Sequence, residues 1–363
     1  MKNSLRFGAV AAAVALALVA CGQAPGDTDK EESGESKGES AKSDVVACMV
    51  SDQGGFDDKS FNQSGHDGLK RAESELGVTV KQAESKDDQD FTPNIENMVQ
   101  GGCDVIIGVG FLMDQAMSEA AEKYPDVKFA LVDSTIGDSS LENTRALLFN
   151  TAEAAYLAGY AAAATSETGK VGTYLGMQIP STAVFADGYA DGIAKYNEDK
   201  GADVQLIGWD KATQTGMAVG DFENQQKGRE FTVQMFEQGA DIVMPVAGPV
   251  GLGSLAAAKE HEGTAIIWVD ADGVLTEPGS AEVILTSVMK EISAAVYDTI
   301  QMVVDDAWTN DPFIGTLAND GVNIAPWHDW ADKIPADLDA EIAALREAII
   351  DGTIKVESEN TPS

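Results

Sequence analysis

Basic residues are scarce in this chain. Its 24 lysines and arginines stand against 60 aspartates and glutamates, which gives a formal net charge of −36 over 363 residues. Such a surface repels phosphate backbones and anionic lipid headgroups. The charge therefore argues against nucleic acid and against an anionic membrane surface as partners, and its simplest explanation is solubility in water.

Histidine and cysteine are scarcer still, with three of each. His66, His261 and His328 form no HExxH motif and lie near no GxSxG turn, and no Cys/His spacing is typical of a metal site. We therefore expect no metal, no cofactor and no catalysis, although a glycosidase-type carboxylate pair would leave no motif. The glycine-rich stretch 247–254 is neither a P-loop nor a GxGxxG motif, so it favours a tight turn or a close backbone approach to a ligand over a phosphate site.

The N-terminus lacks a hydrophobic run long enough to span a bilayer. Lys2 and Arg6 precede an apolar run over residues 7–20. This run is shorter than the roughly 20 residues that a spanning helix needs. This pattern is typical of a secretory signal. The run ends in Leu-Val-Ala-Cys-Gly (18–22), which looks like a bacterial lipobox. We predict a lipoprotein signal peptide over residues 1–21, with Cys21 acylated after cleavage; the alternative is an ordinary signal peptide with a chance cysteine.

The segment after the lipobox is polar. Residues 22–43 have almost no apolar side chains, so they are predicted to form a disordered acidic tether. The mature protein would then be lipid-anchored at the extracytoplasmic face of the cell membrane. The other two cysteines, Cys48 and Cys103, lie in or beside apolar strand-like runs. An exported protein can hold them as a disulfide, and two buried thiols are an equally good alternative.

From residue 44 onward, apolar strand-like runs alternate with helical patterns, and the alternation starts again at residue 170. This repetition predicts parallel sheets covered by helices on both faces. In the first series we expect strands at 45–50, 78–83, 104–110 and 128–134 and helices at 62–76, 92–100 and 114–123. In the second series we expect strands at 170–176, 203–209, 241–248 and 264–272 and helices at 185–200, 226–238 and 254–261.

Three landmarks recur in the same order in both series. FNQSGHDG (61–68) and FADGYADG (185–192) each place an Asp-Gly pair six residues after a phenylalanine. A strand begins at Asp104 or Asp241, and the next strand ends 29 residues later at Asp133 or Asp270. The repetition predicts two similar doubly wound lobes.

Ligands of such sheets bind beyond the carboxyl ends of the strands. Two lobes facing each other would bring Phe61, Asp133, Phe185 and Asp270 to one cleft, where the rings can stack on a planar ligand. The carboxylates can accept hydrogen bonds from a vicinal diol. Lys290 either extends its ammonium to solvent or points it toward these carboxylates.

Each of these residues has a structural alternative. A phenylalanine can pack in the core, and an aspartate after a strand can cap the following helix. Asp272 competes with Asp270 for the same role. Asn62, next to Phe61, can both donate and accept hydrogen bonds, which suits the edge of a heterocycle.

Motifs spread over most of the mature chain carry a resemblance to a known family. They are GGFDDKSFNQSGHDGL (54–69), AAYLAGYAAA (154–163), FEQGADIVMPVAGPVGLG (236–253), VDADG (269–273) and TSVMKEISAAVYDTI (286–300). In these segments the chain resembles the basic membrane protein family of bacterial lipoproteins. Members of that family are substrate-binding proteins of ABC transporters, and the best-understood ones bind purine nucleosides.

The resemblance implies an α/β protein of the type I periplasmic-binding-protein fold, with two doubly wound lobes joined by a multi-strand hinge. It also suggests ligand-binding residues. Phe61 and Phe185 would stack on the base, Asn62 and Asp133 would bind its edge, Asp270 and Lys290 would hold the ribose, and Asp52 and Gly248 would line the site.

These expectations combine into one prediction. Residues 44–150 with about 280–320 would form the first lobe, and 151–279 with about 321–355 the second. The protein would be a monomer that captures a nucleoside, with a purine nucleoside as the expected ligand, and delivers it to ABC permease and ATPase subunits. The alternatives are a sugar or autoinducer-type receptor of the same fold, or a ligand-sensing signalling lipoprotein.

Overall fold

The computed structural model describes residues 43–137 and 141–362. The predicted signal peptide, Cys21 and the predicted tether as far as residue 42 lie outside the described residues. Ser43 already belongs to the fold, because its backbone N–H donates to the Gly77 carbonyl (3.1 Å). Across these two ranges, no helix is both long and apolar enough to cross a membrane.

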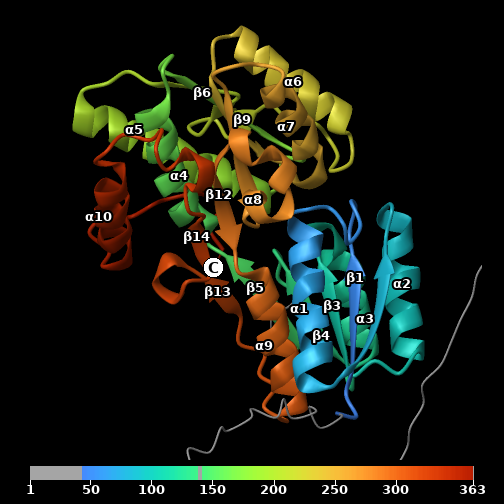
Figure 1. Ribbon diagram of the computed structural model, residues 1–363. Coiled ribbons are helices and arrows are strands. Elements are labelled where there is room, and N and C mark those ends of the chain that lie inside the picture. Colours follow the sequence, from blue (N-terminus) through green and yellow to red (C-terminus); the bar gives the residue numbers. More distant parts are fainter. Residues whose placement is uncertain (1–42, 138–140, 363) are drawn as a thin grey trace, which may run out of the picture. The chain divides into compact units, whose positions relative to one another are not determined.

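The first lobe is built on a six-stranded sheet with strand order β13-β5-β4-β3-β1-β2, in which every pair is parallel (Figure 1). Helices cover both faces of this sheet. Along β1, Ala47 and Met49 face the side of α1, and Cys48 and Val50 face the side of α2 and α3. This period of two is what a doubly covered strand requires. The elements are β1 (Val46–Ser51), β2 (Thr79–Glu84), β3 (Val105–Val109), β4 (Lys128–Val132), β5 (Thr144–Phe149), β13 (Phe313–Gly315), α1 (Phe61–Leu76), α2 (Asp88–Gln100), α3 (Asp114–Lys123) and α9 (Ile292–Val304).

The second lobe is built on another six-stranded sheet, of order β14-β12-β11-β10-β6-β7. Its pairs are parallel except β12 with β14. A small hairpin of β8 (Trp209–Asp210) and β9 (Thr215–Gly216) lies beside it. The other elements are β6 (Lys170–Leu175), β7 (Gln205–Ile207), β10 (Ile242–Val246), β11 (Ala265–Asp270), β12 (Ile284–Lys290), β14 (Val322–Ile324), α4 (Thr151–Thr165), α5 (Pro180–Lys200), α6 (Gln225–Glu237), α7 (Gly251–Lys259), α8 (Gly273–Thr276) and α10 (Leu338–Ile350).

The two sheets have the same strand order and differ in the direction of the last strand, which is parallel to its neighbour in the first sheet and antiparallel in the second. Within each sheet the strands, renumbered by their order along the chain, run 2-1-3-4-5-6 from edge to edge. The chain passes between the sheets after β5, after β12 and between β13 and β14, so three segments connect the lobes. After the first crossing, α4 packs on α5 and β12 of the second lobe. After the second crossing, α9 packs on α1 of the first lobe. The predicted pair of doubly wound lobes is therefore confirmed.

One predicted boundary is wrong. The range of about 280–320 was assigned to the first lobe, but β12 pairs in parallel with β11 in the second sheet, with Ile267 opposite Thr286. The crossing into the first lobe comes after Lys290, and only α9 and β13 of that range belong there. The predicted strand 203–209 is also too long, because Gly208 has a φ of 95° and turns the chain into the β8–β9 hairpin.

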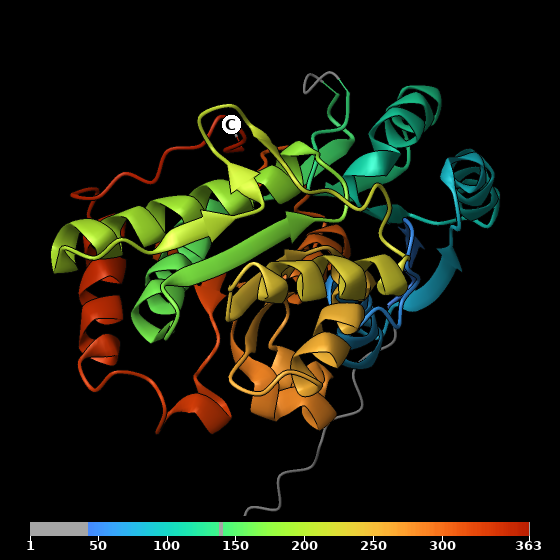
Figure 2. The same cartoon turned by 90° about the horizontal axis from the view of Figure 1, so that it is seen from above.

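Close packing of α4 on α5 fixes the helix that carries Phe185 (Figure 2). Gly188 and Gly192 lie on the contact face of α5. A Cβ atom would lie 2.2 Å from the Ala152 carbonyl oxygen at Gly188, and 1.9 Å from the Tyr156 carbonyl oxygen at Gly192. The two glycines of the FADGYADG stretch (185–192) therefore allow α5 to pack closely on α4.

Cys48 and Cys103 form a disulfide, with their Cα atoms 6.0 Å apart. The bond links β1 to the start of β3 on the face covered by α2 and α3. Of the two alternatives that the sequence left open, the structure has the disulfide.

Candidate functional site

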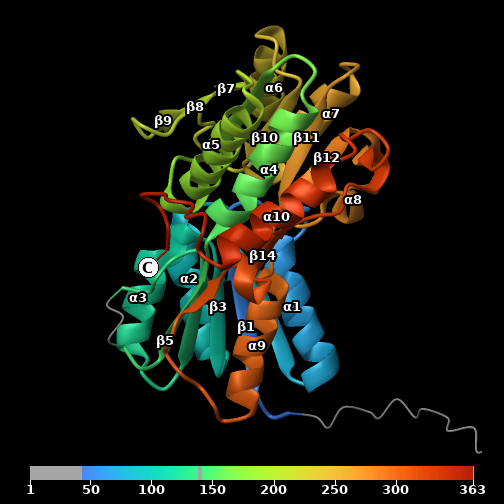
Figure 3. The same cartoon turned by 90° about the vertical axis from the view of Figure 1, so that its left-hand side faces the viewer.

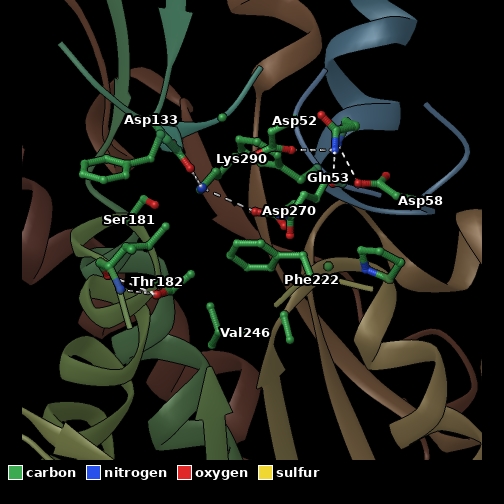
Figure 4. Close-up of a pocket in the computed structure, with 18 of the residues that line it drawn as sticks. Asp52, Gln53, Asp58, Asp133, Ser181, Thr182, Phe222, Val246, Asp270 and Lys290 are labelled. Carbon is green, nitrogen blue, oxygen red and sulfur yellow. Dashed lines mark hydrogen bonds and ion pairs between the residues drawn. The ribbon is translucent and has the colours of Figure 1, made fainter. Parts of the chain in front are cut away.

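A pocket lies between the two lobes, at the carboxyl ends of their central strands (Figure 4). It encloses about 490 Å³ of empty space, including its opening to solvent. All eight residues suggested by the sequence line it: Asp52, Phe61, Asn62, Asp133, Phe185, Gly248, Asp270 and Lys290. Ala247 and Pro249, in the glycine-rich stretch 247–254, also line it. The sequence did not point to the other lining residues, Gln53, Asp58, Gly110, Phe111, Ile179, Ser181, Thr182, Phe222 and Val246.

Asp133 and Asp270 occupy equivalent positions in the two lobes. Asp133 follows β4 directly, Asp270 ends β11, and both have a φ of 69°. This left-handed conformation is uncommon outside glycine and is concentrated at functional sites. Neither residue caps a helix. Asp272 does, because it accepts a hydrogen bond from the N–H of Val274 at the start of α8, and it also pairs with His328 (2.8 Å).

Lys290 points into the pocket. It ends β12, and its Nζ lies 2.5 Å from Asp133 Oδ2 and 3.4 Å from Asp270 Oδ1. Burial alone would lower the pKa of Lys290, but the charges of Asp133 and Asp270 outweigh burial and its pKa is raised. The ammonium therefore stays charged and bridges a carboxylate of each lobe.

Three phenylalanine rings surround this ammonium. Lys290 Nζ lies 5.0 Å from the ring centroids of both Phe61 and Phe185 and 5.9 Å from that of Phe149. The centroids of Phe61 and Phe185 are therefore no more than 10 Å apart. Phe185 is only 1% exposed but still lines the pocket. It therefore packs in the core and also contacts the cleft, two roles that the sequence left open as alternatives.

Asn62 presents a hydrogen-bond acceptor without a partner. Its Nδ2 donates to Asp52 Oδ1 (3.0 Å) and to the Gln53 carbonyl (3.1 Å). Its Oδ1 is buried and has no hydrogen-bond partner among the described residues. Buried polar atoms are normally paired, so this oxygen is suited to a donor on a ligand. Burial also raises the pKa of Asp52 well above its usual range.

Asp58 organises the start of α1, the helix that begins with Phe61. Its carboxylate accepts hydrogen bonds from the backbone N–H groups of Ser60, Asn62 and Gln63 at 2.8–3.0 Å. Burial raises its pKa to about 6 despite these three donors. The sequence signal for this role was an aspartate just before a helix, which is a common capping pattern.

The glycine-rich stretch 247–254 builds one wall of the pocket. Gly248 has a φ of 53° and opens the turn that leads into α7. At Gly253 a Cβ atom would lie 1.9 Å from the Gln225 carbonyl oxygen, so this glycine allows α7 to pack closely on α6. The predicted tight turn is present at Gly248, and the close approach at Gly253 is made to a neighbouring helix.

Two aromatic side chains in the pocket were missed. Phe111 follows the carboxyl end of β3 in the same way that the predicted residues follow their strands, so its position was a usable signal. Phe222 comes from the loop before α6, in the acidic sequence Gly-Asp-Phe-Glu-Asn, and nothing local indicates a pocket. In the part of the chain that the structure describes, no group of three or more His, Cys, Asp or Glu side chains could hold a metal ion.

Comparisons with known proteins agree with this geometry. A family model described as ABC transporter substrate-binding protein, PnrA-like, matches residues 45–360. The chain is 30% identical to the ABC transporter nucleoside-binding protein BmpA of Lactococcus lactis subsp. cremoris, over 96% of this chain and 99% of the relative. It is 33% identical to an uncharacterized lipoprotein of Pyrococcus abyssi, over 90% of this chain and 79% of the relative.

Solved structures share the architecture. A solute-binding protein of an ABC transporter system from Aeropyrum pernix superposes with a TM-score of 0.78 and 26% identity, covering 88% of this chain and 94% of that one. A transcriptional activator of the comK gene from Bacillus halodurans superposes with a TM-score of 0.68 at 20% identity, covering 86% and 100%. At that identity the second likeness concerns the fold alone.

Proposed function

Because the chain belongs to the family of PnrA-like ABC transporter substrate-binding proteins, we propose that it captures a nucleoside, most simply a purine nucleoside, for an ABC permease. Proteins of this family bind a small-molecule substrate for a transporter rather than convert it. The proposal has three parts: the nucleoside as ligand, the role of each pocket residue, and the lipid anchor.

The observation that carries the proposal is the pairing of aromatic and acidic groups from both lobes in one pocket. Phe61 and Phe185 come from equivalent helices, and both rings lie 5.0 Å from the same ammonium. Two rings on opposite sides suit a planar base, and each stacking contact is worth about 1–3 kcal/mol.

The polar groups suggest how the rest of the ligand is bound. A base between the rings would place its edge near Asn62, whose free Oδ1 accepts a donor, and near Asp133. Asp270 would accept hydrogen bonds from the ribose hydroxyls, and Lys290 would donate to the same sugar. Asp52 and Gly248 would complete the walls.

Closure of the lobes would remove the ligand from water and bring the second ring onto the base. The three crossings between the sheets provide the hinge. Three solved structures, a glucose-galactose binding protein, a sugar transporter and a solute-binding protein bound with α-D-tagatopyranose, are 13–14% identical to this chain, so they support the shared fold alone.

Calorimetry with a panel of ligands tests the function. Adenosine, guanosine, inosine, uridine, free adenine and glucose would be titrated into the protein, after native mass spectrometry has identified any co-purifying molecule. We expect purine nucleosides to bind, and Phe61→Ala to weaken them by about 1–3 kcal/mol. Phe236→Ala, which removes a partly buried ring outside the pocket, is the matched control. If no nucleoside binds, or if Phe61→Ala binds nucleosides as tightly as the control and the parent protein do, the proposal is wrong.

We also propose that Cys21 carries the membrane anchor, which the name of the Pyrococcus abyssi relative supports. In Cys21→Ser, the protein should leave the membrane fraction and lose its acyl mass. Acylation that persists in the mass spectrum of this variant would contradict the assignment.

A further inference from the structure

The C-terminal segment, defined here as residues 357–362, lies beside the ligand pocket (the end marked C in Figure 3). It forms one wall of a second cavity of about 750 Å³ of empty space, including its opening to solvent. The other walls come from the first lobe, with Ser134 and Leu148, and from the start of α5 in the second lobe. Phe111, Asp133 and Ser181 line both this side cavity and the ligand pocket.

A buried carboxylate, that of Asp187, binds two side chains of the segment. Asp187 lies in α5 two residues after Phe185 and is 0% exposed. Its Oδ2 accepts hydrogen bonds from Ser358 Oγ (2.5 Å) and from Asn360 Nδ2 (3.1 Å). A buried carboxylate is costly unless it is well hydrogen-bonded, and here the C-terminal segment supplies two of the donors.

The other donors tie the same carboxylate to the β8–β9 hairpin. Asp187 Oδ1 accepts from Trp209 Nε1 and from Gln214 Nε2, both at 2.9 Å. Lys211, in the same hairpin, donates to the Glu357 carbonyl at 2.5 Å. The C-terminal segment is thus fixed to the second lobe, on the rim that faces the first lobe across the side cavity.

We propose that Asp187 is a positioning residue of the ligand site and that it acts through the C-terminal segment. By holding this segment against the side cavity, it narrows the lateral route that leads from the pocket through this cavity to solvent, and it slows ligand release. The consequence for release rests on the proposed function. The shielding of the side cavity does not depend on which ligand the pocket takes.

The first test measures shielding without ligand. Ser134→Cys places a thiol in the wall of the side cavity, and peptide mass spectrometry follows its alkylation at that position alone. Adding Ser358→Ala and Asn360→Ala removes the two donors of the segment and should raise the alkylation rate about 3–10-fold, as expected for the loss of one or two hydrogen bonds. Glu357→Gln, an exposed change in the same segment, and Ser358→Thr, which keeps the hydroxyl, should leave the rate unchanged.

The second test measures whether Asp187 acts through the segment. Asp187→Asn should raise the alkylation rate in the Ser134→Cys protein but add nothing when Ser358→Ala and Asn360→Ala are already present. Thermal unfolding confirms that each variant is folded. Equal alkylation with and without the donors would overturn the proposal, and so would an additive effect of Asp187→Asn.

Stopped-flow release of adenosine, guanosine and inosine completes the experiment. The release rate should rise about 3–10-fold in the Ser358→Ala/Asn360→Ala protein, with little change in the association rate. An unchanged release rate of a bound nucleoside would overturn the role in ligand release. If no nucleoside binds the parent protein while alkylation responds as expected, the proposed function fails and the positioning role of Asp187 stands.

Discussion

Asp133 and Asp270 show how a repeated residue can be recognised by its backbone as well as by its side chain. Both have a φ of 69°, although each belongs to a different lobe. A left-handed aspartate after a strand turns its carboxylate into the space beyond the sheet, where a ligand would lie. The backbone conformation is the same in both lobes because the two residues stand at equivalent positions, at the carboxyl ends of corresponding strands.

Asp270→Asn should separate recognition of the sugar from recognition of the base. Asparagine keeps the size of the side chain and tolerates the left-handed backbone, so the fold should persist. The charged acceptor is lost, and ribonucleosides should bind about 10–100-fold more weakly, whereas a free base should change little. Calorimetry with adenosine and adenine measures both, with Asp272→Asn outside the pocket as the control. Equal losses for the two ligands would remove Asp270 from the sugar site.

Asp58 should make stability depend on pH. Its pKa is raised to about 6 in the folded protein, so between about pH 4 and 6 the folded state keeps a proton that the unfolded state has lost. Stability should therefore fall as the pH rises through this window, by about 3 kcal/mol for this group, and its contribution should be constant above it. Asp58→Asn should remove this component. The comparison is thermal unfolding of both proteins from pH 4 to 7, and parallel curves would contradict the prediction.

At the scale of elements, two helices, α4 and α9, each pack in one lobe although the strand that precedes them in the chain belongs to the other lobe. The chain leaves β5 of the first sheet and forms α4 on the second, and it leaves β12 of the second sheet and forms α9 on the first. At Gly68 of α1, a Cβ atom would lie 2.4 Å from the Ser293 carbonyl oxygen in α9, so this exchanged helix is closely packed. Each lobe thus depends on residues from both halves of the chain, and the lobes cannot separate beyond what their crossings allow.

The disulfide between β1 and the start of β3 should stabilise the first lobe. It closes a loop across a sequence separation of 55, and the chain-entropy model assigns such a loop about 4 kcal/mol. Replacing both Cys48 and Cys103 by alanine should lower the unfolding free energy by an amount of that order. Denaturant unfolding measures it, and the double variant should no longer respond to a reducing agent. If reduction leaves the parent protein unchanged, the bond does not stabilise it.

For the molecule as a whole, negative charge dominates. With 60 acidic and 24 basic residues, like charges repel one another over the entire surface. Most of the ion pairs, such as Lys195 with Asp199, are at the surface and contribute little.

Salt should therefore stabilise this protein. Raising NaCl from about 10 to 200 mM shortens the screening length and weakens the repulsion more than it weakens the few ion pairs. The melting temperature should rise by a few degrees, measured by calorimetry without ligand. A constant or falling melting temperature would show that specific ion pairs outweigh the net charge.

Part of the site could be predicted because it lies at repeated positions. Phe61 and Phe185, like Asp133 and Asp270, stand at corresponding points of two βαβ series, and the ends of parallel strands share one edge of a sheet. Phe222 had no such marker, because it reaches the pocket from a loop whose local sequence is polar and acidic. The C-terminal segment was not predicted either, because its hydrogen bonds with Asp187 join residues more than 170 positions apart in the sequence.

The sequence by itself determined the strands and helices of the two predicted series, the doubling of the design and the residues that repeat, because burial pattern and backbone preference are local properties. It did not predict β5, α4, β13, β14 or α10, which lie outside those series. Only the tertiary structure decided that Lys290 turns toward the carboxylates, that Cys48 and Cys103 are bonded, and that β12 belongs to the second sheet. Each of these depends on which distant segments lie next to each other. That arrangement is set by the packing of whole sheets and crossing helices, and no window of neighbouring residues contains it.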